Sequence, residues 1–281
     1  MKFNVTLIQP NDYIHSFALL EAAEYINIRI NQCGYESALT KNHLERNRAN
    51  VVVCGHLIPE ELLKIDQKLV IFNSEQLPED SVWTSPHYRN LLDKNYVWDY
   101  SPANLLKMKH GNTQLIDFYY CGQLSRLSIK KPAKYDLVFY GSINERRKKI
   151  LDEIVKSGLR VKVIFGAYGG ERDALISESR AVLNLHYYDS QIFQQIRAFY
   201  PLTNRIPIIS ENYPLKSAPD VYKDAIFLNG EEPIEEYSLR MLSSVDFEAQ
   251  AEKKLDQFKK TDLENQFSGL IKNTVEWLNK N

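Results

Sequence analysis

The sequence predicts an α/β protein with two parallel sheets in tandem and a cleft between them. Two observations carry this prediction. Short β-branched runs, such as "ANVVVCG" at 49–55, alternate with stretches of helical periodicity, which is typical of βαβ crossovers. This alternation occurs on both sides of a polar, proline-containing stretch, "LSRLSIKKPAK" at 124–134. We therefore expect a first domain at 1–128, a second at 129–260 and a C-terminal helix at 261–281.

The first half opens with a strand, "FNVTLI", and a turn at 9–12. A long helical pattern, "HSFALLEAAEYINIRINQCG", then ends at Gly34 as its C-cap. The runs "ANVVVCG" and "KLVIFNSE" predict buried strands, and helical stretches are expected at 59–65 and 101–109. This half has fewer clear strands than a complete domain of its type, so we expect it to be trimmed.

The second half shows the same alternation of strands and helices. Strands are expected at 135–141, 161–166, 181–187, 207–211 and 225–230, and helices at 144–157, 172–178 and 191–202. Helical, mixed-charge sequence fills the tail from about Ile234. Its last helix suits bracing of the first domain or solvated packing, and membrane contact is disfavoured because the lysines are interleaved with acids.

Composition excludes several classes. The chain has 281 residues, 44% of them hydrophobic, which is enough to bury a substantial core. A formal net charge of −1 gives no electrostatic reason to expect nucleic acid or an anionic membrane as the main partner. The three cysteines are widely separated, which indicates reduced thiols of a cytoplasmic protein. No apolar run approaches the roughly 20 residues that cross a bilayer.

The mid-chain stretch "DLVFYGSINERRKK" is the first candidate binding site. Gly141 ends an apolar run, so the backbone can approach a ligand there. Ser142 follows, and Arg146 and Arg147 begin the next helix, whose N-terminus favours an anion. Together these groups suit a diphosphate. An ordinary turn before a solvated basic helix explains the same residues, because the stretch lacks the Walker and complete GxGxxG patterns.

Glycines, polar side chains and aromatic residues also follow the later strands of the second half. They are Gly166, Tyr168, Asn184, His186, Tyr188, Arg197 and Glu211. The carboxyl ends of parallel strands meet at one edge of a sheet, where such sheets bind their ligands. These residues therefore suit a nucleotide pocket. His186 is equally explained as a satisfied, half-buried histidine, and the tyrosines as packing at the end of the sheet.

In the first half, His15, Glu75 and Asp99 each follow a predicted strand or apolar run. A histidine or carboxylate at this edge is what a general base needs to take a proton from a hydroxyl. Structural roles remain open: Asp12 and Ser16 suit capping of the first helix, and Glu75 and Asp99 suit structural hydrogen bonds.

Several of these stretches resemble, in order, a family of bacterial GT-B-type glycosyltransferase domains of cell-surface polysaccharide assembly. They are "DYIHS", "NSEQL", "SPHYRNLL", "VWDYSPANL", "YGSINERRKKIL", "VIFGAYGGERDALI", "VLNLHYYDSQIF" with the following "IR", and "NRIPIISE". The resemblance thus extends through about Glu211. It implies two Rossmann-like domains facing a cleft, the second binding a nucleotide sugar and the first an acceptor. It also implies that neither a metal nor a cofactor is required, because a helix dipole and basic side chains neutralise the departing diphosphate.

Two positions depart from the family. Gln194 stands where the family usually has Glu, and an amide cannot act as base or nucleophile. Tyr200 stands where better-known nucleotide-sugar transferases have a ribose-binding Glu, a contact that Glu211 would replace.

On this basis we expect a metal-independent, nucleotide-sugar-dependent glycosyltransferase. Its diphosphate ligands are Gly141, Ser142, Arg146, Arg147 and Arg197. The remaining strand-end residues bind base, ribose or sugar, and His15 is the first candidate for the general base, before Glu75 and Asp99.

The expected acceptor is a glycan or a lipid-linked glycan. Other transferases and the inner face of the cytoplasmic membrane are possible partners. Nucleic acid is not expected, because "ERRKK" lacks interleaved aromatic residues. The alternative is a non-catalytic module of the same fold that binds a nucleotide sugar or glycan beside an active transferase. Gln194 and the trimmed first half favour that alternative.

Overall fold

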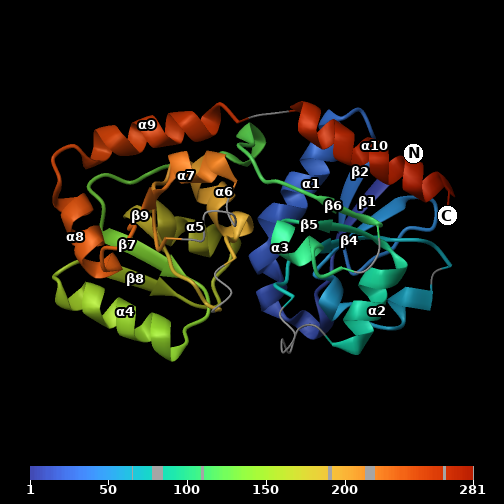
Figure 1. Ribbon diagram of the computed structural model, residues 1–281, viewed down its shortest axis with the longest axis horizontal. Helices are drawn as coiled ribbons and strands as arrows, with labels where there is room; N and C mark the ends of the chain where they lie inside the picture. Colours follow the sequence, from blue (N-terminus) through green and yellow to red (C-terminus); the bar gives the residue numbers. More distant parts are fainter. Residues whose placement is uncertain are drawn as a thin grey trace. The chain divides into compact units, whose positions relative to one another are not determined.

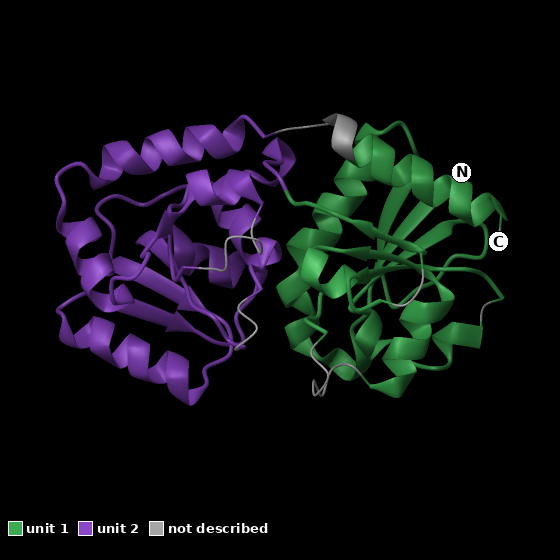
Figure 2. Ribbon diagram, in the orientation of Figure 1, with its two compact units in different colours: residues 1–118, 263–281 green, residues 119–262 purple. Residues whose placement is uncertain are grey.

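The computed structural model divides the chain into two compact units (Figure 2). Unit 1 contains residues 1–118 and 263–281, and unit 2 contains residues 119–262. The structure describes residues 1–64, 66–77, 85–108, 111–188, 192–212, 219–261 and 264–280, of which 264–266 are described by their backbone only.

Unit 1 is built on a parallel sheet that has six strands in the described residues, in the order β2-β1-β3-β4-β5-β6 (Figure 1). The strands are β1 (Phe3–Leu7), β2 (Ser37–Lys41), β3 (Ala49–Val53), β4 (Val70–Asn73), β5 (Tyr96–Asp99) and β6 (Thr113–Leu115). The central strands β1, β3, β4 and β5 are buried at every position, as expected of strands covered on both faces. The direction of strand addition reverses between β1 and β3, which makes their carboxyl ends a topological switch point.

The helices of unit 1 are short except for two. They are α1 (Leu20–Gln32), α2 (Pro86–Lys94), α3 (Pro102–Leu105) and α10 (Glu264–Lys280), with 3-10 turns η1 (Pro10–Asp12), η2 (Ile14–Leu19), η3 (Gly55–Leu57) and η4 (Leu62–Lys64). α2 was not predicted from the sequence, although its start carries two helix signals: Ser85 accepts a hydrogen bond from the Tyr88 N–H, and Pro86 occupies the first turn. α1 ends before Gly34, whose φ of +84° suits the expected C-cap glycine.

The C-terminal helix α10 packs on unit 1. The indole N–H of Trp98 donates to the Thr274 hydroxyl at 3.0 Å, and both residues are fully buried. The rings of Tyr96 and Trp277 lie 5.3 Å apart, and α10 also contacts α1. Residues near the end of the chain therefore complete the core of the first unit.

Unit 2 has a parallel sheet with five described strands in the order β11-β10-β9-β7-β8. The strands are β7 (Tyr135–Tyr140), β8 (Val161–Ile164), β9 (Ser179–Asn184), β10 (Ile208–Ser210) and β11 (Phe227–Leu228). Relative to the chain, this is the same order as β1 to β5 of unit 1, so its switch point lies between β7 and β9.

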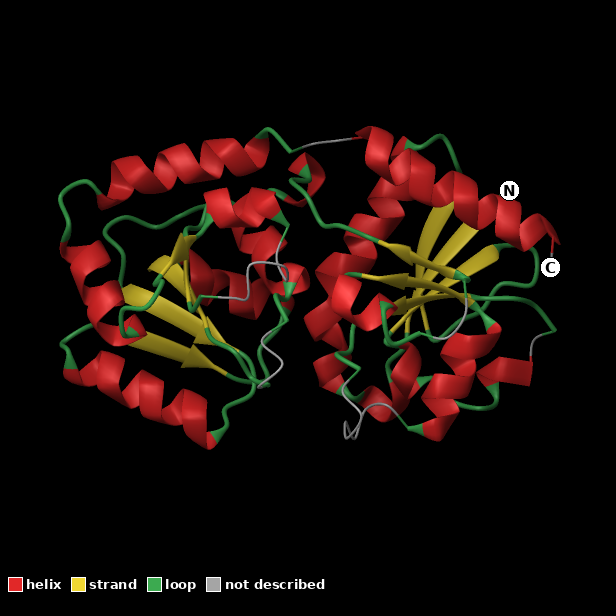
Figure 3. Ribbon diagram, viewed as in Figure 1, coloured by secondary structure: helices red, strands yellow, loops and turns green. Residues whose placement is uncertain are grey.

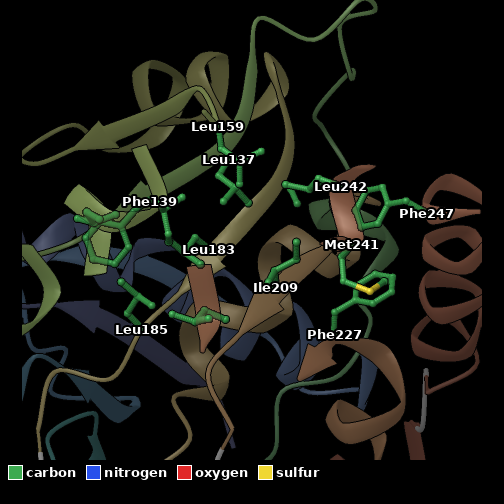
Figure 4. Close-up of a cluster of buried hydrophobic side chains, with 14 of the residues drawn as sticks. Leu137, Phe139, Leu159, Leu183, Leu185, Ile209, Phe227, Met241, Leu242 and Phe247 are labelled. Carbon is green, nitrogen blue, oxygen red and sulfur yellow. The ribbon is translucent and has the colours of Figure 1, made fainter. Parts of the chain in front are cut away.

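Helices surround the second sheet (Figure 3). They are α4 (Glu145–Lys156), α5 (Gly169–Ser177), α6 (Gln195–Thr203), α7 (Asp220–Ala225), α8 (Ile234–Ser243) and α9 (Phe247–Lys259), preceded by the 3-10 turn η5 (Gly122–Leu124). The core on one face joins Leu137 and Phe139 of β7 and Leu183 of β9 to Met241 and Leu242 of α8 (Figure 4). Among the described helices of both units, none combines the length and the apolar character needed to span a membrane.

The predicted α/β class, with two Rossmann-like domains, is confirmed. The trimming of the first domain is not seen, since its sheet has one more described strand than the second. The division between the units falls after Phe118, whereas the sequence placed it after residue 128. The reason is that Arg126 and Leu127 donate their N–H groups to the Asn204 side chain of unit 2, at 2.7 and 2.8 Å.

Several element boundaries also differ from expectation. The helix expected from His15 onward begins instead as the 3-10 turn η2, and the stretch expected to be helical at 59–65 yields η4, with Ile65 outside the described residues. α6 begins at Gln195, and Gln191, where it was expected to begin, is likewise outside the described residues.

We expect Thr274→Val to destabilise unit 1 by about 1–3 kcal/mol, because it leaves the buried Trp98 N–H without its acceptor at nearly unchanged shape. Urea unfolding followed by tryptophan fluorescence measures this, since the tryptophans lie only at 83, 98 and 277, all in unit 1. Asn273→Ala, an exposed neighbour on α10, is the control and should change little. Equal effects of both variants would contradict the role of this hydrogen bond.

Candidate functional site

The switch point of unit 2 begins at Gly141, directly after β7. Its φ of +127° is a conformation that side chains rarely adopt, and an added Cβ would lie 3.3 Å from Nη1 of Arg197. The Arg197 guanidinium therefore lies against the Gly141 backbone, where it donates from Nη2 to the Tyr140 carbonyl and faces the rings of Phe139 and Tyr140. Glycine is favoured here by the positive φ, and the guanidinium leaves little room for a Cβ.

The side chain of Arg147 is buried at the same switch point. It is 2% exposed, and its guanidinium donates to the carbonyls of Ser142 (2.7 Å), Leu185 (2.5 Å) and His186 (3.0 Å). These bonds tie the loop after β7 to the loop after β9. Because this guanidinium is committed to the protein's own carbonyls, we withdraw Arg147 from the expected diphosphate ligands.

The neighbouring Arg146 lies toward solvent, with 42% of its side chain exposed. Both of its terminal nitrogens pair with the Glu211 carboxylate, and Nη1 lies 3.1 Å from Oε2. Glu211 also accepts the His186 N–H at 2.7 Å, so its carboxylate joins α4, β9 and β10. Glu211 is therefore held by the protein, and the expected ribose contact would have to share it with Arg146.

His186 and Asn184 are buried at the end of β9. Nε2 of His186 lies 2.7 Å from the Asn212 carbonyl, and burial lowers the pKa of the imidazole, which keeps it neutral at neutral pH. The Asn184 amide donates to the Ser210 hydroxyl at 3.1 Å. These contacts match the structural alternative for His186, a satisfied buried histidine.

The remaining expected donor residues lie around these loops. Ser142 is exposed, and the ring of Tyr188 packs edge-on against Tyr187 at 4.8 Å. Gly166 follows β8 with a φ of +75°, and Tyr168 occupies the N-cap position of α5. The structure therefore brings the donor set together at the carboxyl edge of one sheet.

The two positions that depart from the resembled motifs, Gln194 and Tyr200, lie at the start of α6 and within it. Gln194 is the N-cap residue, and its carbonyl accepts the Arg197 N–H at 3.0 Å. The Tyr200 hydroxyl donates to Asp173 at 2.6 Å and accepts from Arg126 Nε at 2.9 Å. Tyr200 is 3% exposed, so this position serves a structural network rather than a ribose contact.

In unit 1, Asp99 lies at the end of β5 and is fully buried. Its carboxylate accepts hydrogen bonds from the Ser101 N–H and from the side-chain amides of Asn73 and Asn104. Burial raises the pKa of Asp99 to about 7, an effect that these donors oppose. A carboxylate without exposed surface cannot meet an acceptor hydroxyl directly, so Asp99 is corrected from candidate base to structural group.

Glu75, two residues beyond β4, keeps 21% of its side chain exposed. Its Oε1 accepts from the Ser74 hydroxyl at 3.2 Å and lies 3.6 Å from Nδ1 of His56. Burial raises the pKa of Glu75 and lowers the pKa of His56 to about 4, so the imidazole is neutral at neutral pH. Glu75 thus remains a candidate base.

His15 lies in η2, after the end of β1. It is half-buried, and its ring packs edge-on against Tyr13 at 5.0 Å. It therefore lies on the same edge of the sheet as Glu75, as expected, but inside a 3-10 turn instead of at a helix N-cap.

Sequence reasoning missed three residues of this edge: His56, Asn73 and Asn104. His56 follows "VVVC" by two positions, so the rule that located Glu75 after its strand would have found it. The two asparagines carry no comparable signal, because their roles depend on the buried carboxylate between them.

No family model matches the chain. Its sequence relatives include three uncharacterized proteins of Acanthamoeba polyphaga mimivirus. L140 is 26% identical over 249 residues, which covers 84% of this chain and 77% of that protein. L137 is 27% identical over 212 residues, or 72% of this chain. The chain spans only 27% of the length of L137 and 21% of that of L138.

Solved glycosyltransferase structures share the fold. The β-glucosyltransferase of T4 phage aligns with a TM-score of 0.58 at 12% identity, over 98% of this chain and 99% of that one. WaaG, a glycosyltransferase involved in lipopolysaccharide biosynthesis, aligns with a TM-score of 0.57 at 10% identity, over 96% and 99%. At these identities the likeness shows the fold alone, which is that of GT-B glycosyltransferases.

We expect Gly141→Ala to lower the free energy of unfolding by about 1–3 kcal/mol, because alanine is strained at this φ and its Cβ crowds Arg197. Calorimetric unfolding measures the loss. Gly170→Ala is the matched control, since Gly170 lies in α5 with open space around its Cβ position, and there alanine should be neutral or stabilising by up to about 1 kcal/mol. Similar behaviour of the two variants would show that the approach of Arg197 does not constrain the loop.

Proposed function

We propose that this chain is a glycosyltransferase that moves a sugar from a nucleotide-activated donor to a hydroxyl of a carbohydrate acceptor. Unit 2 binds the donor, and unit 1 supplies the acceptor site and the base. The observation that carries the proposal is the Arg197 guanidinium held against Gly141 at the switch point of unit 2. Sheets of this kind bind ligands at that point, and a guanidinium suits a diphosphate. The shared GT-B fold supports the same reading.

The chemistry requires stabilisation of a leaving diphosphate. Arg197 and the exposed Ser142 lie at the loop after β7, and Arg146 lies beside them on α4. Fixed positive groups stabilise the charge that develops as the bond to the diphosphate breaks, which a metal ion does in other enzymes. We therefore propose a metal-independent transfer, with Asn184, His186 and Glu211 shaping the floor of the pocket. The proton of the acceptor hydroxyl passes to a base of unit 1, either His15 or Glu75.

For the acceptor we propose a glycan or a lipid-linked glycan of a cell-surface polysaccharide. The named role of WaaG in lipopolysaccharide biosynthesis, together with the family resemblance of the motifs, supports this class. One specific observation favours the second candidate, a non-catalytic sugar-binding module: Gln194 occupies the N-cap of α6 where the family has a carboxylate. Release of nucleoside diphosphate from a nucleotide sugar by the purified protein would decide for the enzyme.

We expect Arg197→Ala to weaken binding of a nucleotide sugar by about 10- to 100-fold, since a hydrogen bond to a charged group contributes about 1.5–3 kcal/mol. Isothermal titration with UDP-glucose, UDP-N-acetylglucosamine and GDP-mannose identifies the donor and measures the change. Arg160→Ala is the control: it removes the same charge at the opposite, amino edge of the sheet, where Arg160 pairs with Asp136. An unchanged donor affinity in Arg197→Ala would refute the proposed diphosphate site.

A further inference from the structure

The backbone of Glu75 is held from both sides by two buried amides. The Glu75 N–H donates to Oδ1 of Asn73 at 3.2 Å. The Glu75 carbonyl accepts from Nδ2 of Asn73 at 2.9 Å and from Nδ2 of Asn104 at 2.8 Å. Asn104 also accepts the Leu77 N–H at 3.1 Å, so the segment after β4 is fixed at two residues. These hydrogen bonds fix the position of the Glu75 backbone, and with it the base of its side chain.

Asp99 determines how these amides are oriented. Its Oδ2 accepts from Nδ2 of Asn73 at 2.6 Å, and both of its oxygens lie 3.1 Å from Nδ2 of Asn104. In its ionised form Asp99 only accepts hydrogen bonds, so each asparagine turns its NH₂ toward Asp99 and its oxygen toward the loop. The oxygen of Asn73 is further fixed by the Tyr88 hydroxyl, which donates to it at 2.8 Å. Asp99 thus sets the geometry of a partly exposed residue, Glu75, that it does not contact directly.

The Glu75 carboxylate lies among groups that suit a proton acceptor. Nδ1 of His56 and the hydroxyl of Ser74 lie near its Oε1. Cys54 and Tyr88 are close enough for the charge of Glu75 to raise their pKa values. Burial raises the pKa of Glu75, which brings the carboxylate closer to the basicity that a general base needs near neutral pH.

We propose that Glu75 is the general base of the transfer and that Asp99 is a positioning residue, acting through Asn73 and Asn104. This inference rests on the proposed function. In the step, the acceptor O–H bond breaks and its proton passes to the Glu75 carboxylate. The acceptor oxygen forms a bond to the anomeric carbon, and the bond from that carbon to the diphosphate oxygen breaks, its electron pair leaving with the nucleoside diphosphate.

The first test is Glu75→Gln, assayed by the release of nucleoside diphosphate from a nucleotide sugar. The donor is the one of UDP-glucose, UDP-N-acetylglucosamine and GDP-mannose that binds most tightly, and the acceptor is water or a methyl glycoside. We expect turnover to fall by about 10²–10⁴-fold. Donor affinity should stay unchanged. The wild-type protein should lose kcat/KM as the pH falls through the raised pKa of Glu75, because the base must be deprotonated, and the glutamine variant should lack this acid limb.

The second test separates positioning from stability. Asp99→Asn places an NH₂ group against the donors of Asn73 and Asn104, so the loop should shift and kcat should fall by up to about 10²-fold, with donor KM unchanged. The control is Asn95→Asp, a matched one-atom change in a buried side chain that bonds the Leu69 N–H and the Leu91 carbonyl just before β5. It should lower thermal stability comparably and leave kcat within about twofold when assayed well below the unfolding transition.

The outcomes are distinguishable. Glu75 is overturned as the base if Glu75→Gln keeps full transfer, or if His15→Ala loses transfer and Glu75→Gln does not. In either case, binding of a nucleotide sugar by the wild-type protein would still support the proposed function. Equal kcat in Asp99→Asn and Asn95→Asp overturns the positioning role. A wild-type protein that binds none of the three nucleotide sugars and releases no nucleoside diphosphate overturns the proposed function and this inference with it.

Discussion

The buried guanidinium of Arg147 is the interaction on which the candidate donor site depends. Desolvating a charge costs several kcal/mol unless hydrogen bonds replace water. Here three backbone carbonyls and the ring faces of Phe139 and Tyr187 replace it. Since arginine cannot lose its proton in a protein, the two loops must keep their carbonyls directed at it. The loop that carries Gly141 is thereby fixed to the end of β9, and the position of Arg197 against Gly141 follows from a loop that is already rigid.

Unit 1 also has a buried ionisable side chain at the carboxyl end of a strand, but here it is an acid. Asp99 is buried at the end of β5 and is compensated by an N–H and two side-chain amides. In each unit a buried ionisable group fixes a loop at the carboxyl edge of the sheet, and a less buried ionisable residue lies on or next to that loop. This residue is Arg146 in unit 2 and Glu75 in unit 1. Arg147 and Asp99 are each held by several hydrogen bonds, and through these bonds they fix the loops near Arg146 and Glu75.

The sequence predicted the α/β class and most of the buried strands because those strands are continuous apolar runs. It did not predict β5 as a strand, since its apolar run is only three residues long. It also missed β2 and β6, whose sequences "SALTK" and "TQL" are partly exposed edge strands without an apolar run. It located the candidate edges but could not separate Arg146 from Arg147, since adjacent helical residues point about 100° apart and only the packing shows which one is buried. Likewise, Glu75 lies just after β4 and Asp99 lies at the end of β5, and only the structure shows that Asp99 is buried while Glu75 is partly exposed.

The two arginines that remain candidate diphosphate ligands, Arg146 and Arg197, are not equivalent. Arg146 is paired at both terminal nitrogens with Glu211, a buried carboxylate that also accepts a backbone N–H, so the charge of Arg146 is largely compensated within the protein. Arg197 donates to the Tyr140 carbonyl and faces the rings of Phe139 and Tyr140, and these contacts hold its guanidinium against the Gly141 backbone. A diphosphate bound at Arg146 would have to compete with the Glu211 carboxylate for the same two nitrogens. Glu211 is therefore the residue that limits what Arg146 can contribute to stabilising the leaving charge.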